Sequence, residues 1–301
     1  MAVDSSKTAL PAPSHLGVVV EDLDKAKESL SRVLGLGPWQ VIDYAPNKDE
    51  LLIGEPFRLR LAVAGRAPLV LELVQPLEGK SIWSEFLERK GEGLHHIAFT
   101  IPNWNEKVQI MEQAGNRMAV GGTINSKRWC YFETSPGGLV VEYEEDIGGG
   151  QGVSDVPEYI DTVKLPPPEN ITVVVKDIDK TTEFLSRVCG IGPWETMEYA
   201  PTRDELMVGE PFKLKFAFAT LGPIVLQLTQ PLEGKTLWSG FLENKGEGLH
   251  NLFFSVPNWE EVVAKFKEQG SRILAGGSLD GKRWCIFDTK PGGIIIELGE
   301  S

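Results

Sequence analysis

The chain has few cysteines, few positive charges and no long hydrophobic run. Its three cysteines, Cys130, Cys189 and Cys285, are an odd number without the CxxC spacing of a metal site, so we expect reduced, mostly buried thiols. No apolar run approaches the roughly 20 residues that a membrane-spanning helix needs. The net charge of −13 argues against a nucleic acid or an anionic membrane as partner. A small molecule is the expected partner.

What the chain does contain is typical of a globular protein. Hydrophobic residues make up 42% and charged residues 24%, and 301 residues suffice for two domains with separate cores. Residues 1–13 lack the apolar core of a signal peptide and the arginines of a transit peptide. We therefore expect a cytoplasmic protein.

All eight tryptophans pair at one spacing, which reveals a tandem duplication. Trp39, Trp83, Trp104 and Trp129 each recur 155 positions later, and residues 13–145 align with 168–300 without a gap. Between the repeats lies a stretch that is rich first in glycine and then in proline. The predicted domains are residues 13–147 and 168–301, joined by a linker over 148–167.

Each repeat divides once more into two similar halves. A predicted strand over 15–20 is followed by a helix from Asp22 to Leu34, which Gly35 ends. Three β-like runs follow, at residues 39–44, 57–64 and 69–74.

The same order then starts again within the repeat. A strand over 94–101 leads into a helix opened by Asn103, with Glu106 three residues on in a pattern that resembles a capping box. Three more β-like runs follow, and the last covers residues 139–143. The sequence thus predicts an α+β fold of four βαβββ modules, two in each repeat.

Polar residues stand at selected positions of the otherwise apolar strands. In a βαβββ module the helix should cover one face of the sheet and leave the other to line a cleft. The first and fourth strands of each module in repeat one carry His15, Glu72, His96 and Glu142. Two imidazoles and two carboxylates suit a divalent first-row metal, and a glutamate inside an apolar strand is costly unless it is paired or coordinated.

Two stretches carry a resemblance to a known family. The run from Phe86 to Phe99, FLERKGEGLHHIAF, and the run from Pro136 to Glu142, PGGLVVE, resemble signatures of the vicinal oxygen chelate superfamily. This superfamily includes glyoxalase I, methylmalonyl-CoA epimerase, bleomycin resistance proteins and extradiol dioxygenases. The sequences of these two runs are most similar to those of the epimerase-like and glyoxalase I-like members, and the resemblance covers both repeats.

The resemblance implies a fold, a cofactor and a set of ligands. Paired βαβββ modules would form an open barrel, a glyoxalase-like domain with a cleft, around one divalent metal ion, with Zn, Ni, Co, Mn and Fe all possible. Carried over position by position, the ligands are His15, Glu72, His96 and Glu142. A glutamate at position 72 matches glyoxalase I better than the epimerases.

The expected activity is that of a metal-dependent isomerase, epimerase or glyoxalase-type lyase. The metal would stabilise an enolate of a small substrate with neighbouring oxygens, and Glu142 and Glu72 are the candidate catalytic bases. One alternative is an extradiol, ring-cleaving dioxygenase, which uses two histidines and one carboxylate. Another is a binding or resistance protein without chemistry.

Repeat two departs from this pattern at three of the four positions. It has Asn170, Gln227, Asn251 and Glu297, and amides are much poorer ligands for such metals. We therefore expect one metal per chain, held by repeat one. Because single-repeat relatives commonly pair as homodimers, the chain is expected to be a monomer that resembles a dimer, or a homodimer.

Other polar residues favour a structural interpretation. His95 and His250 occur in both repeats, and each should point away from the cleft as a structural histidine. Arg58 and Arg60 alternate with apolar residues, which indicates a solvated strand face more than an anion site.

Overall fold

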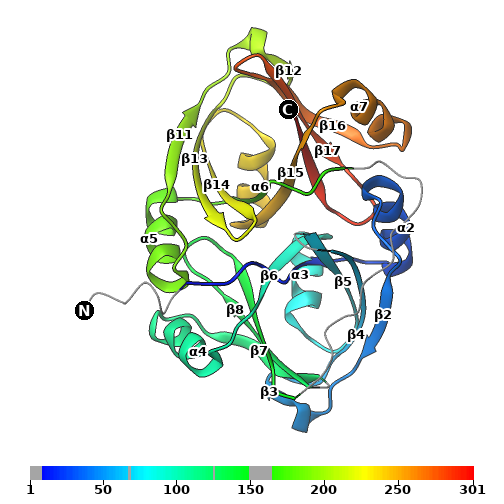
Figure 1. Ribbon diagram of the computed structural model, residues 1–301, viewed down its shortest axis with the longest axis vertical. Helices are drawn as coiled ribbons and strands as arrows, with labels where there is room; N and C mark the ends of the chain where they lie inside the picture. The colour runs from blue at the N-terminus through cyan, green and yellow to red at the C-terminus, as the bar shows by residue number, and fades with distance from the viewer. Residues whose placement is uncertain (1–8, 67–68, 125, 149–164) are drawn as a thin grey trace.

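The protein consists of two similar halves, one from each repeat, in a computed structural model that describes residues 9–66, 69–124, 126–148 and 165–301 (Figure 1). The elements of repeat one are β1 (His15–Val19), α2 (Leu23–Leu34), β2 (Gln40–Tyr44), η1 (Lys48–Glu50), β3 (Leu51–Ile53), β4 (Arg58–Arg66), β5 (Leu69–Glu78), α3 (Ile82–Lys90), β6 (Gly93–Thr100), α4 (Trp104–Gln113), β7 (Met118–Ile124), β8 (Lys127–Glu133) and β9 (Val140–Asp146).

Repeat two presents the same elements in the same order. They are β10 (Asn170–Val174), α5 (Ile178–Cys189), β11 (Glu195–Tyr199), η2 (Arg203–Glu205), β12 (Leu206–Val208), β13 (Lys213–Leu221), β14 (Ile224–Glu233), α6 (Leu237–Lys245), β15 (Gly248–Val256), α7 (Trp259–Glu268), β16 (Arg272–Leu279), β17 (Lys282–Asp288) and β18 (Ile295–Glu300).

Most helix ends follow local sequence signals, but the N-termini of α4 and α7 lack the side-chain capping bond. The side chain of Asp22 accepts a hydrogen bond from the backbone N–H of Lys25, and Gly35 ends α2 at φ 69°, a left-handed conformation that glycine adopts without strain. The helix α4 begins directly after Asn103 as predicted, but the Asn103 side chain makes no capping hydrogen bond. The capping box expected there does not form.

The two modules of repeat one join edge to edge in a single nine-stranded sheet. Its order is β2-β4-β5-β1-β6-β9-β8-β7-β3, so that the first strand of each module lies near the centre. The strand β1 runs antiparallel to β6, while β1 pairs in parallel with β5 and β6 with β9. The second sheet repeats this order strand for strand, which confirms the predicted fold of four modules in two tandem domains.

Different helices pack against the two faces of each curved sheet. On one face Leu16, Val18 and Leu73 pack in the same core as the buried residues of α2. On the other face Val19 and Val74 pack against Trp83 of α3. Figure 1 shows α3 and α6 enclosed by the curved strands of their own halves. These two helices, and the short strands β3 and β12, were not predicted.

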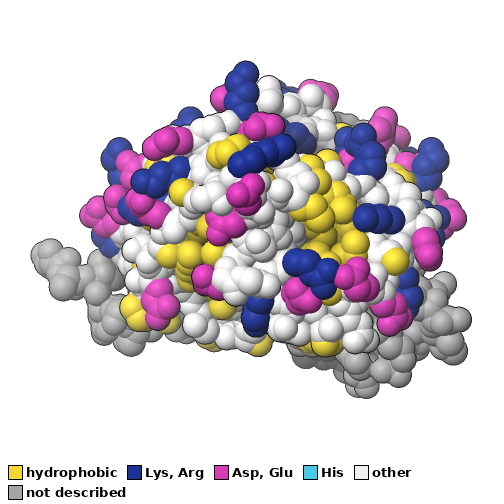
Figure 2. All heavy atoms as spheres, turned by 90° about the horizontal axis from the view of Figure 1, so that it is seen from above, with side chains coloured by type: hydrophobic (Ala, Val, Ile, Leu, Met, Phe, Trp, Pro, Cys, Tyr) yellow, Lys and Arg dark blue, Asp and Glu magenta, His cyan; other side chains and the backbone are white. Residues whose placement is uncertain are grey.

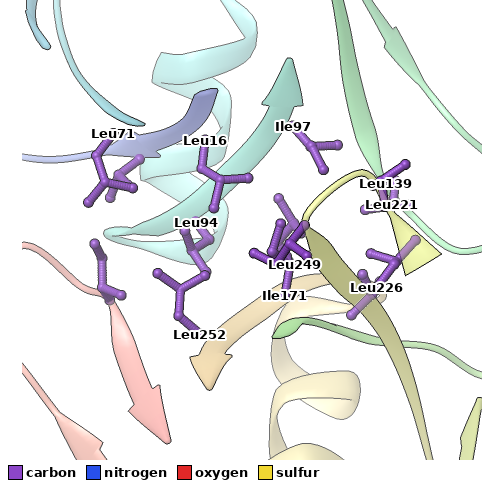
Figure 3. Close-up of a cluster of buried hydrophobic side chains, with 14 of the residues drawn as sticks. Leu16, Leu71, Leu94, Ile97, Leu139, Ile171, Leu221, Leu226, Leu249 and Leu252 are labelled. Atoms are coloured by element: carbon purple, nitrogen blue, oxygen red, sulfur yellow. The ribbon is translucent and has the colours of Figure 1, made fainter. Parts of the chain in front are cut away.

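One hydrophobic core joins the two repeats. Figure 3 shows Leu16, Leu94 and Ile97 of repeat one beside Leu249 and Leu252 of repeat two, and all five side chains are buried. Side chains of α2 also reach the second half, since Leu30 lies beside Gly292. The halves therefore share a core in the way that two subunits of a dimer would.

Four further observations concern the surface and the sequence predictions. The view from the repeat-two end shows hydrophobic side chains lying among lysine, arginine, aspartate and glutamate side chains (Figure 2). The three cysteines are free and buried, as expected. Among the described residues no helix has the length and apolar character to cross a membrane. Most of the predicted linker, residues 149–164, lies outside the described residues, and so do residues 1–8.

Candidate metal centre

Four side chains from four strands converge on one point of the first sheet. His15 comes from β1, Glu72 from β5, His96 from β6 and Glu142 from β9. One ligand atom from each lies within 4.8 Å of all the others. The four neighbouring strands at the centre of the sheet thus bring together all four residues that the sequence singled out.

Both histidines present the same ring nitrogen to this point. Nε2 of His15 and Nε2 of His96 lie 3.3 Å apart. Oε2 of Glu142 is 3.1 Å from the first and 3.2 Å from the second, and Oε2 of Glu72 is 3.6 Å from each. Two ligands bound about 2.1 Å from one ion lie roughly 3–3.4 Å apart. The spacing fits a single ion.

The surroundings of the buried Glu142 carboxylate support the same conclusion. Oε2 of Glu142 is buried and has no hydrogen-bond partner of acceptable geometry among the described residues. A buried carboxylate oxygen that faces two imidazole nitrogens is costly unless a cation, either a metal ion or a proton, lies between them. With two imidazoles and a second carboxylate beside it, the donor set fits a divalent first-row metal.

The absence of a side chain at position 17 makes room for this arrangement. Gly17 pairs with His96 across β1 and β6. A Cβ atom at position 17 would lie 1.8 Å from Cε1 and 2.2 Å from Nε2 of His96. Only glycine leaves the space that the imidazole of His96 occupies.

The prediction for His95 is wrong because of a β-bulge. The register of β1 and β6 shifts between Gly17 and Val18, so that His95 is the extra residue of the pair. Nδ1 of His95 therefore lies 3.0 Å from Nδ1 of His96, and its ring packs edge-on against Phe86 of α3. His95 does not point away from the site as expected. It is buried directly behind a candidate ligand.

A second group of polar residues, which sequence reasoning missed, surrounds His15. Oε2 of Glu144 lies 3.9 Å from Nδ1 of His15 and accepts a hydrogen bond from the Ser14 hydroxyl at 3.3 Å. Lys127 Nζ is 3.6 Å from the other oxygen of Glu144. Partners of this kind orient metal-binding histidines. The signal was present, because Glu144 is two residues from Glu142 and so faces the same way.

Burial and the neighbouring carboxylates shift the pKa values of the candidate ligands in opposite directions. Burial lowers the pKa of His15, but the close approach of Glu142 and the charge of Glu72 outweigh it and raise the value to about 9. The pKa of His96 is raised for the same reason, again against the effect of burial. Burial raises the pKa of Glu142, but the two histidines outweigh this and lower it. Without a metal, the site holds protons instead.

The arginines of β4 lie outside this centre, in agreement with their predicted role. Nη1 of Arg60 is 3.2 Å from Asp24 of α2, and Nη1 of Arg58 is 3.1 Å from Glu78. Both guanidinium groups are partly exposed at the edge of the face that α2 covers.

Repeat two has a network of hydrogen bonds at the four matching positions. The Asn170 amide donates to Oε1 of Gln227 at 3.0 Å, and the Asn251 amide donates to Oε2 of Glu297 at 2.9 Å. Burial raises the pKa of Glu297 to about 7, although the bond from Asn251 lowers it. The amides thus satisfy one another and the carboxyl group without a cation.

Comparison with known proteins places the chain in a family. The model of the Glyoxalase/Bleomycin resistance protein/Dioxygenase superfamily matches residues 14–131 and again 170–286. The uncharacterized protein YqjC of Bacillus subtilis (strain 168) is 33% identical over 138 residues, which are 44% of this chain and 91% of YqjC. That relative has about the length of one repeat.

Solved structures share the tandem architecture. A mutant of 4-hydroxymandelate synthase from Streptomyces coelicolor superimposes with a TM-score of 0.67 at 15% identity, over 97% of this chain and 93% of its own. BphC, a halotolerant catechol dioxygenase, gives 0.53 at 11% identity, over 98% and 88%. An extradiol ring-cleaving dioxygenase from B. fuscum gives 0.53 at 15% identity, over 98% and 72%.

At these identities the likeness establishes the fold. The two family matches and the duplicated sheet agree with each other. Members of this superfamily are mostly metal-dependent enzymes that act on small molecules. The chain belongs to the glyoxalase, bleomycin resistance protein and dioxygenase superfamily, as a tandem duplication.

Proposed function

We propose that repeat one holds one divalent metal ion through His15, Glu72, His96 and Glu142 and transfers a proton within a small substrate that carries two neighbouring oxygens. The reaction class is that of an isomerase, an epimerase or a glyoxalase-type lyase. The observation that carries the proposal is the second carboxylate, Glu72, whose Oε2 is equally close, at 3.6 Å, to both histidine nitrogens.

The two carboxylates are suited to different tasks. The side chain of Glu142 is 6% exposed and lies closer to both histidines, so it serves to hold the ion. The side chain of Glu72 is 15% exposed, which makes it the better general base. In this proposal Glu72 takes the proton next to the substrate carbonyl and returns it to another face or another carbon.

The remaining chemistry is divided between the ion and the wall of the site. The ion, when bound, would act as a Lewis acid towards the negative charge that develops on the two substrate oxygens. Tyr131 is buried with its ring 5.0 Å from that of His96, and burial raises its pKa well above the ordinary value. Tyr131 therefore stays a neutral phenol and keeps water from that side of the histidine.

The test replaces His96 by Asn, the residue that repeat two already has. We expect the His96→Asn variant to lose the metal and, with it, deuterium incorporation from D2O into α-hydroxy ketones and hemithioacetals, followed by NMR. A matched change in repeat two, Asn251→Ser, should leave both intact. Exchange that persists in a metal-free His96→Asn protein would contradict the proposal.

A ring-cleaving dioxygenase is the second candidate, and one observation favours it. His15, His96 and Glu142 approach one another more closely, at 3.1–3.3 Å, than Glu72 approaches either histidine. Two histidines and one carboxylate are the ligand set of non-haem iron oxygenases.

Replacing Glu72 separates the two candidates. If the protein is a dioxygenase, a Glu72→Gln variant loaded anaerobically with Fe(II) should still consume oxygen in the presence of catechols. If it is an isomerase or lyase, the same variant should keep its metal through His15, His96 and Glu142, which lie closest together, and lose deuterium exchange because the base is gone.

A further inference from the structure

Repeat two contains a cleft of about 450 Å³ at the place where repeat one has its candidate metal centre. This volume lies within the range of small-molecule sites, about 300–1,000 Å³. Asn170, Gln227 and Glu297 line it, and these are three of the four positions that match the ligands of repeat one. Met197 and Leu279, at 40% and 38% exposure, also line the cleft, so it opens to solvent.

The wall of this cleft is more aromatic than the matching wall of repeat one. Leu61, Val63 and Ala98 of repeat one correspond to Phe216, Phe218 and Phe253, 155 positions later. All three phenylalanines line the cleft together with Tyr199 and Trp284. The rings of Phe216 and Phe218 lie 5.9 Å apart, a separation within the usual range of aromatic pairs.

The substitutions come in sterically matched pairs. Where repeat one has Ala98 and Glu144, repeat two has Phe253 and Gly299. A Cβ atom at position 299 would lie 2.6 Å from Cζ of Phe253, so the aromatic ring needs the glycine. The same exchange removes a carboxylate that stands beside His15 in repeat one.

A second matched pair lies on the two central strands of repeat two, β10 and β15. Gly17 and His96 of repeat one correspond to Thr172 and Asn251. A Cβ at position 17 would collide with His96, whereas Thr172 is accommodated beside the shorter asparagine, and both residues are fully buried. Both exchanges keep the side chains around the second cleft free of clashes. Its wall is aromatic at positions where that of repeat one is aliphatic.

At the four positions that match the ligands of repeat one, its polar groups are amides and one carboxyl group. Charged side chains of both signs, Asp280, Lys282, Arg283 and Glu300, also line the cleft, and Arg283 is paired with Glu300. Asn170 and Gln227 bond to each other, and Glu297 receives one bond, from Asn251. Burial raises the pKa of Glu297 to about 7, so near neutral pH part of the protein carries the protonated carboxyl group, which can donate a hydrogen bond as well as accept one. Such a floor discriminates in favour of a ligand that has a hydroxyl or carbonyl group.

We propose that the cleft of repeat two is a second, metal-independent binding site for an uncharged aromatic molecule that carries a hydroxyl or carbonyl group. The aromatic ring packs against Phe216, Phe218 and Phe253, and the oxygen bonds with Asn170, Gln227 and Glu297. The site does not depend on the metal or on the reaction proposed for repeat one.

The test uses 1-naphthol as the probe and the full chain treated with EDTA. Calorimetry should show one equivalent bound per chain, with the same affinity before and after removal of metal. The charged analogue 1-naphthoate should bind at least about tenfold more weakly, because Asp280 and Glu300 balance the charges of Lys282 and Arg283 in the lining, and Glu297 adds a further carboxyl group.

Three double variants locate the site. Phe216→Leu with Phe218→Val installs the residues of repeat one and should weaken 1-naphthol about tenfold, through loss of two aromatic contacts. His15→Ala with His96→Ala removes the metal site of repeat one and should leave the affinity unchanged. Thermal unfolding shows whether each variant is folded, and a second pair, Asn170→Ala with Gln227→Ala, tests the floor if the first does not fold.

Three outcomes would overturn the proposal. They are no saturable binding of 1-naphthol, binding that requires the metal, and binding that survives both repeat-two variants but is lost with His15 and His96. A failure of the reaction proposed for repeat one affects none of these measurements.

Discussion

Gly17 and His96 occupy facing positions on the two central strands of repeat one, and the imidazole fills the space that a Cβ at position 17 would need. The matching residues of repeat two, Thr172 and Asn251, reverse this relationship. One strand pair thus accepts either a histidine opposite a glycine or an asparagine opposite a threonine. The presence of a metal ligand at this place is decided by both residues together.

Replacing Gly17 alone should therefore damage repeat one. We expect Gly17→Thr to lower the free energy of unfolding by at least about 3 kcal/mol, because the added atoms overlap a buried ring. Adding His96→Asn should recover most of that loss but should not restore metal binding. Denaturant unfolding of the two single variants and the double variant measures the coupling. If the loss in the free energy of unfolding of the double variant equals the sum of the losses of the two single variants, the steric argument is contradicted.

The converse change should create a metal site in repeat two. A variant with Asn170→His, Gln227→Glu and Asn251→His presents the ligand types of repeat one together with Glu297. We expect it to bind a second equivalent of metal only when Thr172→Gly is added, because the new imidazole needs that space. Elemental analysis after gel filtration counts the ions. A second equivalent in the triple variant, with Thr172 retained, would show that the threonine does not block the site.

Metal binding should release protons at neutral pH. Burial lowers the pKa of His15, but Glu142 and Glu72 raise it to about 9, so the imidazole is protonated at pH 7 when no metal is bound. The pKa of His96 is also raised. Only the neutral imidazole is a ligand, so affinity should increase from pH 6 to about 9 and then level off. Calorimetry in buffers of different ionisation enthalpy gives the number of protons released. Release of none at pH 7 would contradict these pKa directions.

The stability of the metal-free protein should follow the opposite trend. The folded pKa of His15, about 9, lies above its ordinary value of 6.5. Its proton therefore stabilises the fold fully below pH 6.5, and this contribution is lost as the pH rises through about 9. The Tm of the metal-free protein should fall over that range. In a variant with His15→Asn and His96→Asn the fall should be absent, and a fall of equal size there would assign it to other groups.

Glu144 should tune the affinity for the metal without being a ligand. It lies 3.9 Å from Nδ1 of His15, on the side away from the proposed ion. Loss of a partner of this kind typically costs about 10–100-fold in metal affinity, so we expect an effect of this size from Glu144→Gln in a competition assay with a chelating dye. The neighbouring Glu145 is bonded to Arg128 instead, and Glu145→Gln is the matched control. Equal effects of both variants would point to a general change in charge.

The sequence by itself determined the architecture of this protein. The spacing of 155 residues between paired tryptophans required two equal halves, and the alternation of apolar residues set which strand residues share a face. The resemblance of the sequence to the vicinal oxygen chelate superfamily then supplied His15, Glu72, His96 and Glu142 as one set of ligands before any contact was known.

Only the tertiary structure decided the surroundings of these residues. The bulge at Gly17 and Val18 turned His95 towards His96, because one extra residue reverses the alternation on which the prediction rested. The helix α3 lies inside the curve of the sheet because Trp83 and Phe86 pack against apolar residues there. Its sequence is too short to show a clear helical periodicity, so it was not predicted. The shape of the cleft in repeat two depends on pairs such as Phe253 and Gly299, in which an aromatic ring occupies the space that a side chain would need. Such pairings join residues distant in the chain, and they exist only when the strands lie side by side.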